Sequence, residues 1–334
     1  MKAIICFGEV LIDFQPILPS PTTQTARFEQ HAGGAPANVA VAVAALGGKA
    51  EFVGMLGTDP FSDFLLDSLR RANVATTHIQ RTSAAPTALA FVTLDENGER
   101  SFSFYRSPAA DLLFRESRLP ARAFAKAAIL HACSNSLTEE GIAQATLACM
   151  RRAREAGALV SFDMNLRPAL WPAGVEPGPR IRAALALADV VKLSAEELAF
   201  LAAFAGSESA ALDAILSETA QLVLVTDGAR PIRWRARDTH GTLDTYEVEA
   251  IDSTAAGDAF SGGILFALAD IGIDTLSLPD LIGDPARLNA VLRFGAACGA
   301  LATTRRGAFA AMPSRAEVEA LIRSTAIETL KVAS

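Results

Sequence analysis

The sequence predicts an α/β fold with three α/β/α layers, in which a central, mostly parallel sheet carries helices on both faces. Short apolar runs of strand length alternate with longer amphipathic or alanine-rich runs of helical length. Alternation on this scale is typical of a parallel sheet that is covered on both sides. One segment, residues 86–106, breaks the alternation and predicts a small β appendage.

Six apolar runs have the length and composition of buried strands, and they cover residues 3–10, 51–57, 127–133, 158–164, 189–194 and 221–227. Several of the helical runs between them begin at Pro or Thr and end at Gly, as helix ends commonly do. These predicted helices cover residues 36–48, 60–74, 138–157 and 195–206.

Residues 86–106 consist of two strand-like halves around Asn97-Gly98, a dipeptide that favours a tight hairpin turn. A hairpin inserted into an α/β chain projects from the parallel sheet, where it would form a lid over a site or a contact with another subunit. No Pro/Ser-rich linker, repeat or charge block divides the chain, so we expect one domain over residues 1–334.

Charge and composition argue against two classes of partner. The net charge of −7 disfavours a nucleic-acid surface, which needs a basic excess. Because we find no signal-peptide pattern and no run long enough to span a bilayer, we expect a cytoplasmic protein without a membrane partner.

The cysteines lack metal or redox spacing and are expected to be buried free thiols: Cys6, Cys133, Cys149 and Cys298.

The segment GGAPANVA, residues 33–40, places two glycines before a helix and Asn38 on its first turn. Glycines at such a position allow the backbone to approach a ligand closely, although a simple helix start would look the same. A dinucleotide fingerprint needs Gly-x-Gly-x-x-Gly directly after a strand. Here the third glycine is missing and Pro36 occupies the turn, which argues against a nicotinamide enzyme.

Two further motifs follow predicted strands, at the edge where open parallel sheets bind ligands. In DMNLRPALW, Asp163, Asn165 and Arg167 alternate, and in extended backbone they would point to one side and suit hydroxyl or phosphate groups. A salt bridge beside an exposed asparagine is the alternative. In KLSAEEL, Glu197 falls in the first turn of a helix, where an acidic residue is most often a helix cap.

The segment DSTAAGDAF, residues 252–260, precedes a long apolar helical run. The backbone N–H groups of residues 255–258 at a helix N-terminus would form a concavity that attracts an anion. A carboxylate at Asp258 beside a phosphate is unfavourable unless it accepts a proton from an attacking hydroxyl. The segment therefore indicates phosphoryl transfer, with an acidic residue favoured by the helix dipole as the alternative.

Taken in order, the motifs resemble the ribokinase-like (PfkB) carbohydrate kinase family over nearly the whole chain, and within it the fructokinases. The segments that carry the resemblance are GEVLID, GGAPANVAVAVAALGG, GTDPFSDFL, FSFYRSPAADLLF, DMNLRPALWP, KLSAEEL, LVLVTDGA, DSTAAGDAF and TRRGAFAAMPS. The resemblance implies a mostly parallel sheet flanked by helices, with a small β lid from about residues 13–28 and 86–108. In relatives this lid often forms a dimer contact, which implies a homodimer.

The resemblance also implies roles for individual residues. Asp258 would be the base that deprotonates the primary hydroxyl of the sugar, and the transferring phosphoryl group would lie on the amides of Ala255, Ala256, Gly257 and Asp258. The implied sugar ligands are Asp13, Gly33, Gly34, Asn38, Phe104, Arg106, Asn165 and Arg167. Glu197, Thr226, Gly228 and Gly257 would contact ATP.

Two metal ions are implied as well. Glu197 would organise Mg²⁺ through water, and Asp252 with backbone groups near Thr254 and Gly307 would bind a monovalent cation, K⁺. Many relatives carry glycine where this chain has Ala255. Other relatives also carry alanine there, so we expect Ala255 in an ordinary backbone conformation and Gly257 as the glycine that the turn requires.

The motifs leave the substrate open, because specificity depends on the shape of the pocket. Fructose is the first expectation. The alternatives are 2-keto-3-deoxygluconate, whose carboxylate would pair with Arg106 and Arg167, and ribose or a nucleoside. A sugar-binding regulator without catalysis is a further alternative, although a binding module has no need for a base at Asp258.

Overall fold

The computed structural model describes residues 1–17, 27–94, 100–325 and 331–333. Its core is a ten-stranded sheet that is parallel from β11 to β5 and antiparallel from β11 to β14. In order across the sheet, the strands are β14 (Lys331–Ala333), β13 (His240–Leu243), β12 (Arg230–Arg235), β11 (Leu222–Asp227), β10 (Val190–Ser194), β9 (Leu159–Asp163), β8 (Ala127–Cys133), β1 (Ala3–Phe7), β4 (Ala50–Leu56) and β5 (Ala75–Arg81). The three-layer α/β/α prediction is confirmed.

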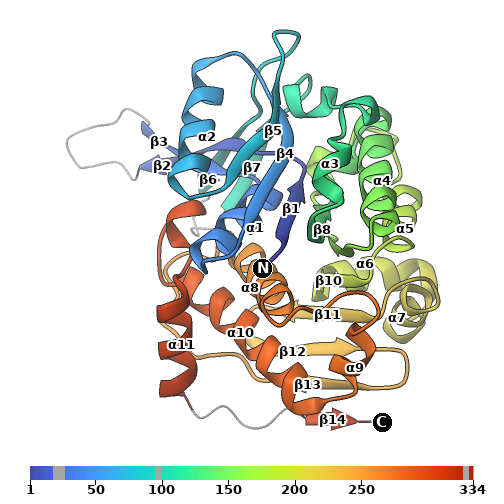
Figure 1. The fold of residues 1–334 in the computed structure, drawn as a ribbon. Helices are drawn as coiled ribbons and strands as arrows, with labels where there is room; N and C mark the ends of the chain where they lie inside the picture. The colour runs from blue at the N-terminus through green and yellow to red at the C-terminus, as the bar shows by residue number, and fades with distance from the viewer. Residues whose placement is uncertain (18–26, 95–99, 326–330, 334) are drawn as a thin grey trace.

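The helices lie in two groups on opposite faces of this sheet (Figure 1). One group packs into the hydrophobic cluster that contains Ile4 and Cys6, and it comprises α1 (Ala35–Ala45), α2 (Pro60–Arg71), α8 (Ala256–Asp270), α9 (Leu278–Ile282), α10 (Pro285–Thr303) and α11 (Arg315–Ser324). The other group packs into the cluster that contains Ile5 and Phe7, and it comprises α3 (Ala121–Phe124), α4 (Glu140–Glu155), α5 (Pro177–Leu185), α6 (Ala195–Ala205) and α7 (Glu208–Leu216). Successive residues of β1 thus face opposite layers, as strand geometry requires.

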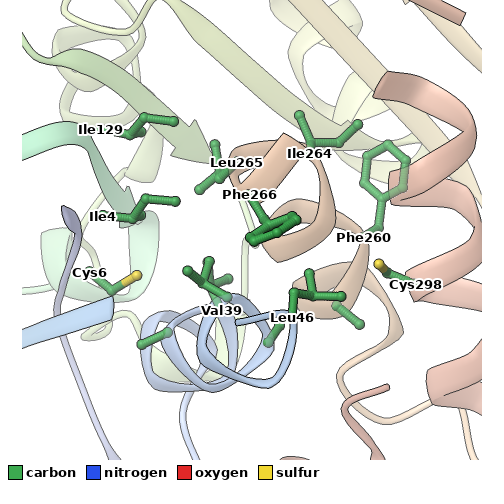
Figure 2. Close-up of a cluster of buried hydrophobic side chains, with 14 of the residues drawn as sticks. Ile4, Cys6, Val39, Leu46, Ile129, Phe260, Ile264, Leu265, Phe266 and Cys298 are labelled. Atoms are coloured by element: carbon green, nitrogen blue, oxygen red, sulfur yellow. The ribbon is translucent and has the colours of Figure 1, made fainter. Parts of the chain in front are cut away.

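The six predicted strands and the four predicted helices are present, with ends that differ by a few residues. Local sequence explains several of the helix starts. Pro60 begins α2, and the side chain of Asp59 caps it by accepting from the Ser62 amide. Figure 2 shows how α1 and α8 meet beneath the sheet, with Val39 and Phe266 facing Ile4. The contact between these two helices places the N-terminus of α8 beside α1.

A second sheet of four strands has the order β3-β2-β6-β7. Its strands are β2 (Leu11–Ile17), β3 (Arg27–Gly33), β6 (Leu89–Leu94) and β7 (Arg100–Tyr105). The predicted hairpin is therefore present as the antiparallel pair β6–β7, and the second predicted lid piece corresponds to β2 and β3. The turn at Asn97-Gly98 and residues 18–26 lie outside the described residues.

Five short 3₁₀ helices complete the described elements: Ala110–Leu113, Glu116–Arg118, Ser134–Leu137, Pro168–Leu170 and Phe309–Ala311. The four cysteines are buried and free, as the sequence predicts. Within the described residues, no single helix is both long and apolar enough to cross a membrane. The pair α6 and α7 reaches that length together, but it is bent by 89° at the break.

Candidate active site

Two cavities meet at the loop and first turn that lead into α8. The smaller, of about 290 Å³, is lined by Thr254, Ala255 and Asp258, and the larger, of about 500 Å³, by Ala256 and Gly257. Ser253 lines both. Two ligands, one in each cavity, would therefore meet at residues 253–258. The first amides of α8 lie at this junction without a side-chain cap, and of those of residues 255–258 the Ala256 amide donates to the Ser253 carbonyl at 3.2 Å.

The backbone of this turn differs from the expectation. Ala255 is the N-cap of α8 and adopts φ 58° and ψ 13°, a left-handed conformation. The expectation of an ordinary conformation at Ala255 was therefore wrong. Gly257, by contrast, is not among the glycines with positive φ. A side chain at Ala255 costs about 1 kcal/mol in this conformation.

Asp258 projects from the first turn of α8 into the small cavity. The side-chain amide of Asn38 on α1 donates a hydrogen bond of 2.7 Å to its Oδ2. Burial raises the pKa of Asp258 to about 6, while the Asn38 bond and the positive charges of Lys192 and Arg167 oppose the shift. Negative charge on Asp163 adds to the increase. The carboxylate is thus placed and tuned to take up a proton near neutral pH.

Asp13 on β2 lines the same cavity, opposite the β3 residue His31 in the register of the second sheet. Burial raises its pKa to about 7, and the charges of Asp258 and Glu9 add to the increase. Gly33 does not line the cavity. Instead, a Cβ at Gly33 would lie 2.0 Å from Oδ2 of Asp13, so glycine there makes room for the Asp13 carboxylate.

Glu9, the second residue of the GEVLID motif, also lines this cavity, although no role was predicted for it. The guanidinium of Arg106 donates to Asp111 Oδ2 at 2.5 and 2.8 Å and lies 4.0 Å from Glu9 Oε2. Its third nitrogen donates to the backbone carbonyl of Asn135 at 2.7 Å. Arg106 is only 4% exposed. Its charge is therefore already matched by two buried carboxylates.

Several groups in the small cavity have hydrogen-bonding capacity left. Asn135 donates from Nδ2 to Glu9 Oε1 at 3.0 Å. Its Oδ1 and the Oδ1 of Asn38 are buried and have no hydrogen-bond partner among the described residues. Buried amide oxygens of this kind normally accept a hydrogen bond. They suit a ligand that presents hydroxyl donors.

The DMNLRP segment does not run extended as predicted. Strand β9 ends at Asp163, and Asn165 adopts φ 36°, a region that asparagine tolerates. Asn165 and Arg167 line the small cavity, whereas Asp163 does not. Asp163 instead pairs with Lys192 of β10 at 3.1 Å and accepts from Ser261 of α8 at 3.3 Å. The chain turns after β9, and this turn separates the three side chains.

Glu197 lies outside both cavities and caps α6. Its Oε2 accepts from the Ser194 amide at 2.7 Å, and the Ser194 hydroxyl accepts from the Glu197 amide at 3.1 Å, which forms a capping box. Its Oε1 accepts from the Leu166 amide at 2.7 Å. The helix-cap interpretation is confirmed. The same carboxylate also anchors the segment that carries Asn165 and Arg167.

Asp252 joins two loops beside the N-terminus of α8. Its Oδ1 accepts from the Thr254 amide at 2.8 Å, and its Oδ2 accepts from the Gly307 amide at 3.2 Å. The carboxylate is 2% exposed. Among the described residues, no group of three or more His, Cys, Asp or Glu side chains is arranged to hold a metal ion. Any cation bound here would therefore rest largely on backbone oxygens.

The larger cavity contains three of the four predicted nucleotide residues, Thr226, Gly228 and Gly257, and not Glu197. Much of its wall comes from residues that were not predicted to contact the nucleotide: Ala229, Ile232, Thr245, Tyr246, Glu247, Val248, Ala250, Phe260, Ala296, Gly299, Ala300 and Thr303. The small cavity likewise contains Phe104 and Gly34 as predicted, together with the unpredicted Leu11, Ala35 and Leu170. Asn135 follows the carboxyl end of β8, and that position was the signal that could have found it.

Comparisons with known proteins all give one family of proteins. The family described as pfkB family carbohydrate kinase matches residues 1–315. The probable fructokinase-4 of Arabidopsis thaliana is 41% identical over 324 residues, which are 96% of this chain and 96% of that protein. Fructokinase-1 of Zea mays is 42% identical over 322 residues, covering 96% of this chain and 98% of the relative.

Solved structures give the same result. The fructokinase of Xylella fastidiosa with bound ATP has a TM-score of 0.93 and 54% identity, and the match covers 97% of this chain and 98% of that one. The fructokinase of Vibrio cholerae O395 with fructose, ADP and calcium has a TM-score of 0.84 and 35% identity, covering 96% and 99%.

Proposed function

Because this chain belongs to the pfkB family of carbohydrate kinases, we propose that it transfers the γ-phosphoryl group of ATP to fructose and forms fructose 6-phosphate. The observation that carries the proposal is the position of Asp258, in the small cavity at the turn where the two cavities meet. A sugar in one cavity and a nucleotide in the other would meet at a base and a set of free amides. That arrangement supplies the positioning and charge stabilisation that phosphoryl transfer needs.

Fructose would occupy the small cavity. Its hydroxyl groups can donate to the buried amide oxygens of Asn38 and Asn135, which have no partner among the described residues, and to the carboxylate of Asp13. Asn165, Phe104 and Gly34 line the remaining wall. Asp258 would accept the proton of the attacking primary hydroxyl, and its pKa of about 6 leaves it mostly ionised at neutral pH.

The charges around the small cavity favour a neutral sugar over 2-keto-3-deoxygluconate. Besides Glu9, which lies beside Arg106, two carboxylates line the cavity, those of Asp13 and Asp258. Arg106 is bound to Asp111 by two hydrogen bonds and is close to Glu9, so its charge is not available to a substrate carboxylate. A substrate anion would therefore be attracted by Arg167 alone and repelled by the carboxylates of the cavity.

ATP would occupy the larger cavity, with its phosphates directed toward the amides of residues 255–258. Mg²⁺, when bound, would neutralise phosphate charge. The carboxylate of Glu197 already accepts two hydrogen bonds from backbone amides, so it would accept from the water ligands of Mg²⁺ through its remaining lone pairs. The oxygen donors around Asp252 fit a hard monovalent cation such as K⁺. At that site the carboxylate also holds the loops of Thr254 and Gly307 together.

We further propose that residues 1–334 act as one cytoplasmic kinase domain and that two copies pair through the second sheet. Two exposed aromatic side chains lie on one face of that sheet, each against the ring of Phe91: Phe28 is 39% exposed and Tyr105 65%. Exposed apolar groups that lie close together often mark an interface. Sedimentation analysis of the protein, compared with a Tyr105→Glu variant, tests this pairing.

The test of function is ADP release with ATP, Mg²⁺ and a panel of fructose, 2-keto-3-deoxygluconate and ribose. We expect fructose to stimulate release most strongly. Stronger stimulation by 2-keto-3-deoxygluconate or ribose would reassign the substrate. If no sugar stimulated release but fructose bound, the protein would be a sugar-binding regulator and the proposed kinase activity would be wrong.

A further inference from the structure

Lys192 lies on β10, directly opposite Asp163 of β9 in the register of the main sheet. Its ammonium lies 3.1 Å from Oδ2 and 3.2 Å from Oδ1 of Asp163, and its side chain is 12% exposed. Among the described residues, the hydrogen bonds of this ammonium all go to that one carboxylate. An ammonium group has three N–H donors, so donors remain for another acceptor.

The ammonium of Lys192 also lies against the turn between the two cavities. A Cβ placed at Gly257 would be 3.0 Å from Nζ of Lys192. In a helix the Cα–Cβ bond tilts toward the N-terminus, so this contact puts the ammonium beside the N-terminal end of α8. The free amides of the turn are at that same end. Glycine at 257 leaves space for the lysine, which explains this residue without a positive φ.

Negative charge surrounds this lysine. Burial opposes its charge, but Asp163, Glu197 and Asp258 together raise the pKa of Lys192, so it stays protonated. A triphosphate that arrives at the turn would add further negative charge beside these carboxylates. The backbone amides carry only partial positive charge. A full positive charge next to them would stabilise the equatorial oxygens of the transferring group.

We propose that Lys192 is a further catalytic residue, whose ammonium contacts the transferring phosphoryl group at the 255–258 turn and neutralises its charge. The assignment rests on the proposed kinase function. In the transfer, the bond from the sugar oxygen to the γ-phosphorus forms while the bond from that phosphorus to the β,γ-bridging oxygen breaks. The hydroxyl proton goes to Asp258, and the electron pair of the broken bond leaves with ADP. Lys192 donates hydrogen bonds throughout and releases no proton.

The test is Lys192→Met, with Lys192→Arg as the charge-retaining variant and the exposed Lys49→Met as the matched control. We expect kcat to fall about 10²–10³-fold in Lys192→Met while the KM for fructose changes by less than about threefold. Because ADP lacks the γ-phosphate, a non-hydrolysable ATP analogue should lose about tenfold more affinity than ADP, measured by calorimetry. Lys49→Met should match the wild type, and Lys192→Arg should recover part of the rate.

Lys192→Met leaves Asp163 without its cation, so Lys192→Met/Asp163→Asn is measured as well. A double variant that still binds ADP but has lost the preference for the ATP analogue supports the assignment. Recovery of wild-type kcat, or of that preference, in the double variant would show that Lys192 only balances Asp163, and the proposal would fall. A kcat within about threefold of wild type in Lys192→Met would overturn it too. If the wild type itself released no ADP with any sugar, the proposed function would fail, while the two binding constants would still decide the role of Lys192.

Discussion

Asn38→Leu should shift the pH dependence of phosphorylation toward alkaline pH. Asn38 donates a 2.7 Å hydrogen bond to Oδ2 of Asp258, and this bond opposes the burial that raises the pKa of Asp258 to about 6. Hydrogen bonds to charged groups contribute about 1.5–3 kcal/mol. Leucine keeps the size of asparagine but cannot donate, so the ionised form of Asp258 loses this stabilisation.

One pKa unit corresponds to about 1.4 kcal/mol, so the pKa of Asp258 should rise by about 1–2 units. With a pKa of about 6, roughly nine-tenths of the Asp258 carboxyl groups are ionised at pH 7, and with a pKa of ~7.5 about a quarter are. A smaller fraction of Asp258 is then ionised and able to accept a proton at neutral pH. The kcat/KM for fructose should fall about fourfold at pH 7 for this reason alone, and this part of the loss should vanish near pH 9.

The assay is kcat/KM for fructose at saturating ATP, measured from about pH 5 to about pH 9. Asn135→Leu is the matched control, because Asn135 lines the same cavity but donates to Glu9 and not to Asp258. The control should lower kcat/KM without shifting the pH at which kcat/KM falls on the acid side of the profile, its acid limb. An acid limb in Asn38→Leu that coincides with that of the wild type would refute the reasoning.

Three further predictions concern neighbouring groups. Asp13 has a folded-state pKa of about 7 against an ordinary value of 3.8, so its contribution to stability falls as pH rises between these values. Asp13→Asn should therefore raise the free energy of unfolding by about 4 kcal/mol at pH 8 and by little at pH 4. Denaturant titrations measure this, and equal effects at both pH values would contradict it. Ala255→Gly should raise the free energy of unfolding by up to about 1 kcal/mol, seen as a higher melting temperature, and should retain activity. A lower melting temperature would argue against strain at Ala255. In the wild type, the initial rate should be higher in K⁺ than in tetramethylammonium, and in Asp252→Asn the two rates should be equal. Activation by K⁺ that persists in the variant would remove Asp252 from the cation site.

Sequence predicted the parts of the fold that depend on local pattern. The six buried strands and four helices follow from apolar runs and from helix ends, and the mostly parallel sheet follows from strand–helix alternation. The motifs also predicted most of the wall of the small cavity but little of the wall of the larger one. Sequence missed the left-handed backbone at Ala255, since alanine gives no local sign of that conformation.

The remaining misses depend on tertiary neighbours. Glu9 and Asn135 become site residues only because β1 and β8 are adjacent in the sheet. Asp163 leaves the site because the chain turns after β9 and Lys192 lies beside it. Residues 245–248 line the larger cavity from a segment without regular structure, so no periodic pattern marks them.

The central claim is that Asp258 accepts the proton of the sugar hydroxyl. The most direct measurement is kcat of Asp258→Asn with saturating fructose and ATP, together with calorimetric binding of fructose to the same variant. The account predicts a loss of kcat of about 10²–10⁴-fold while fructose still binds. Turnover equal to that of the wild type would contradict the claim and leave the junction of the two cavities without its base.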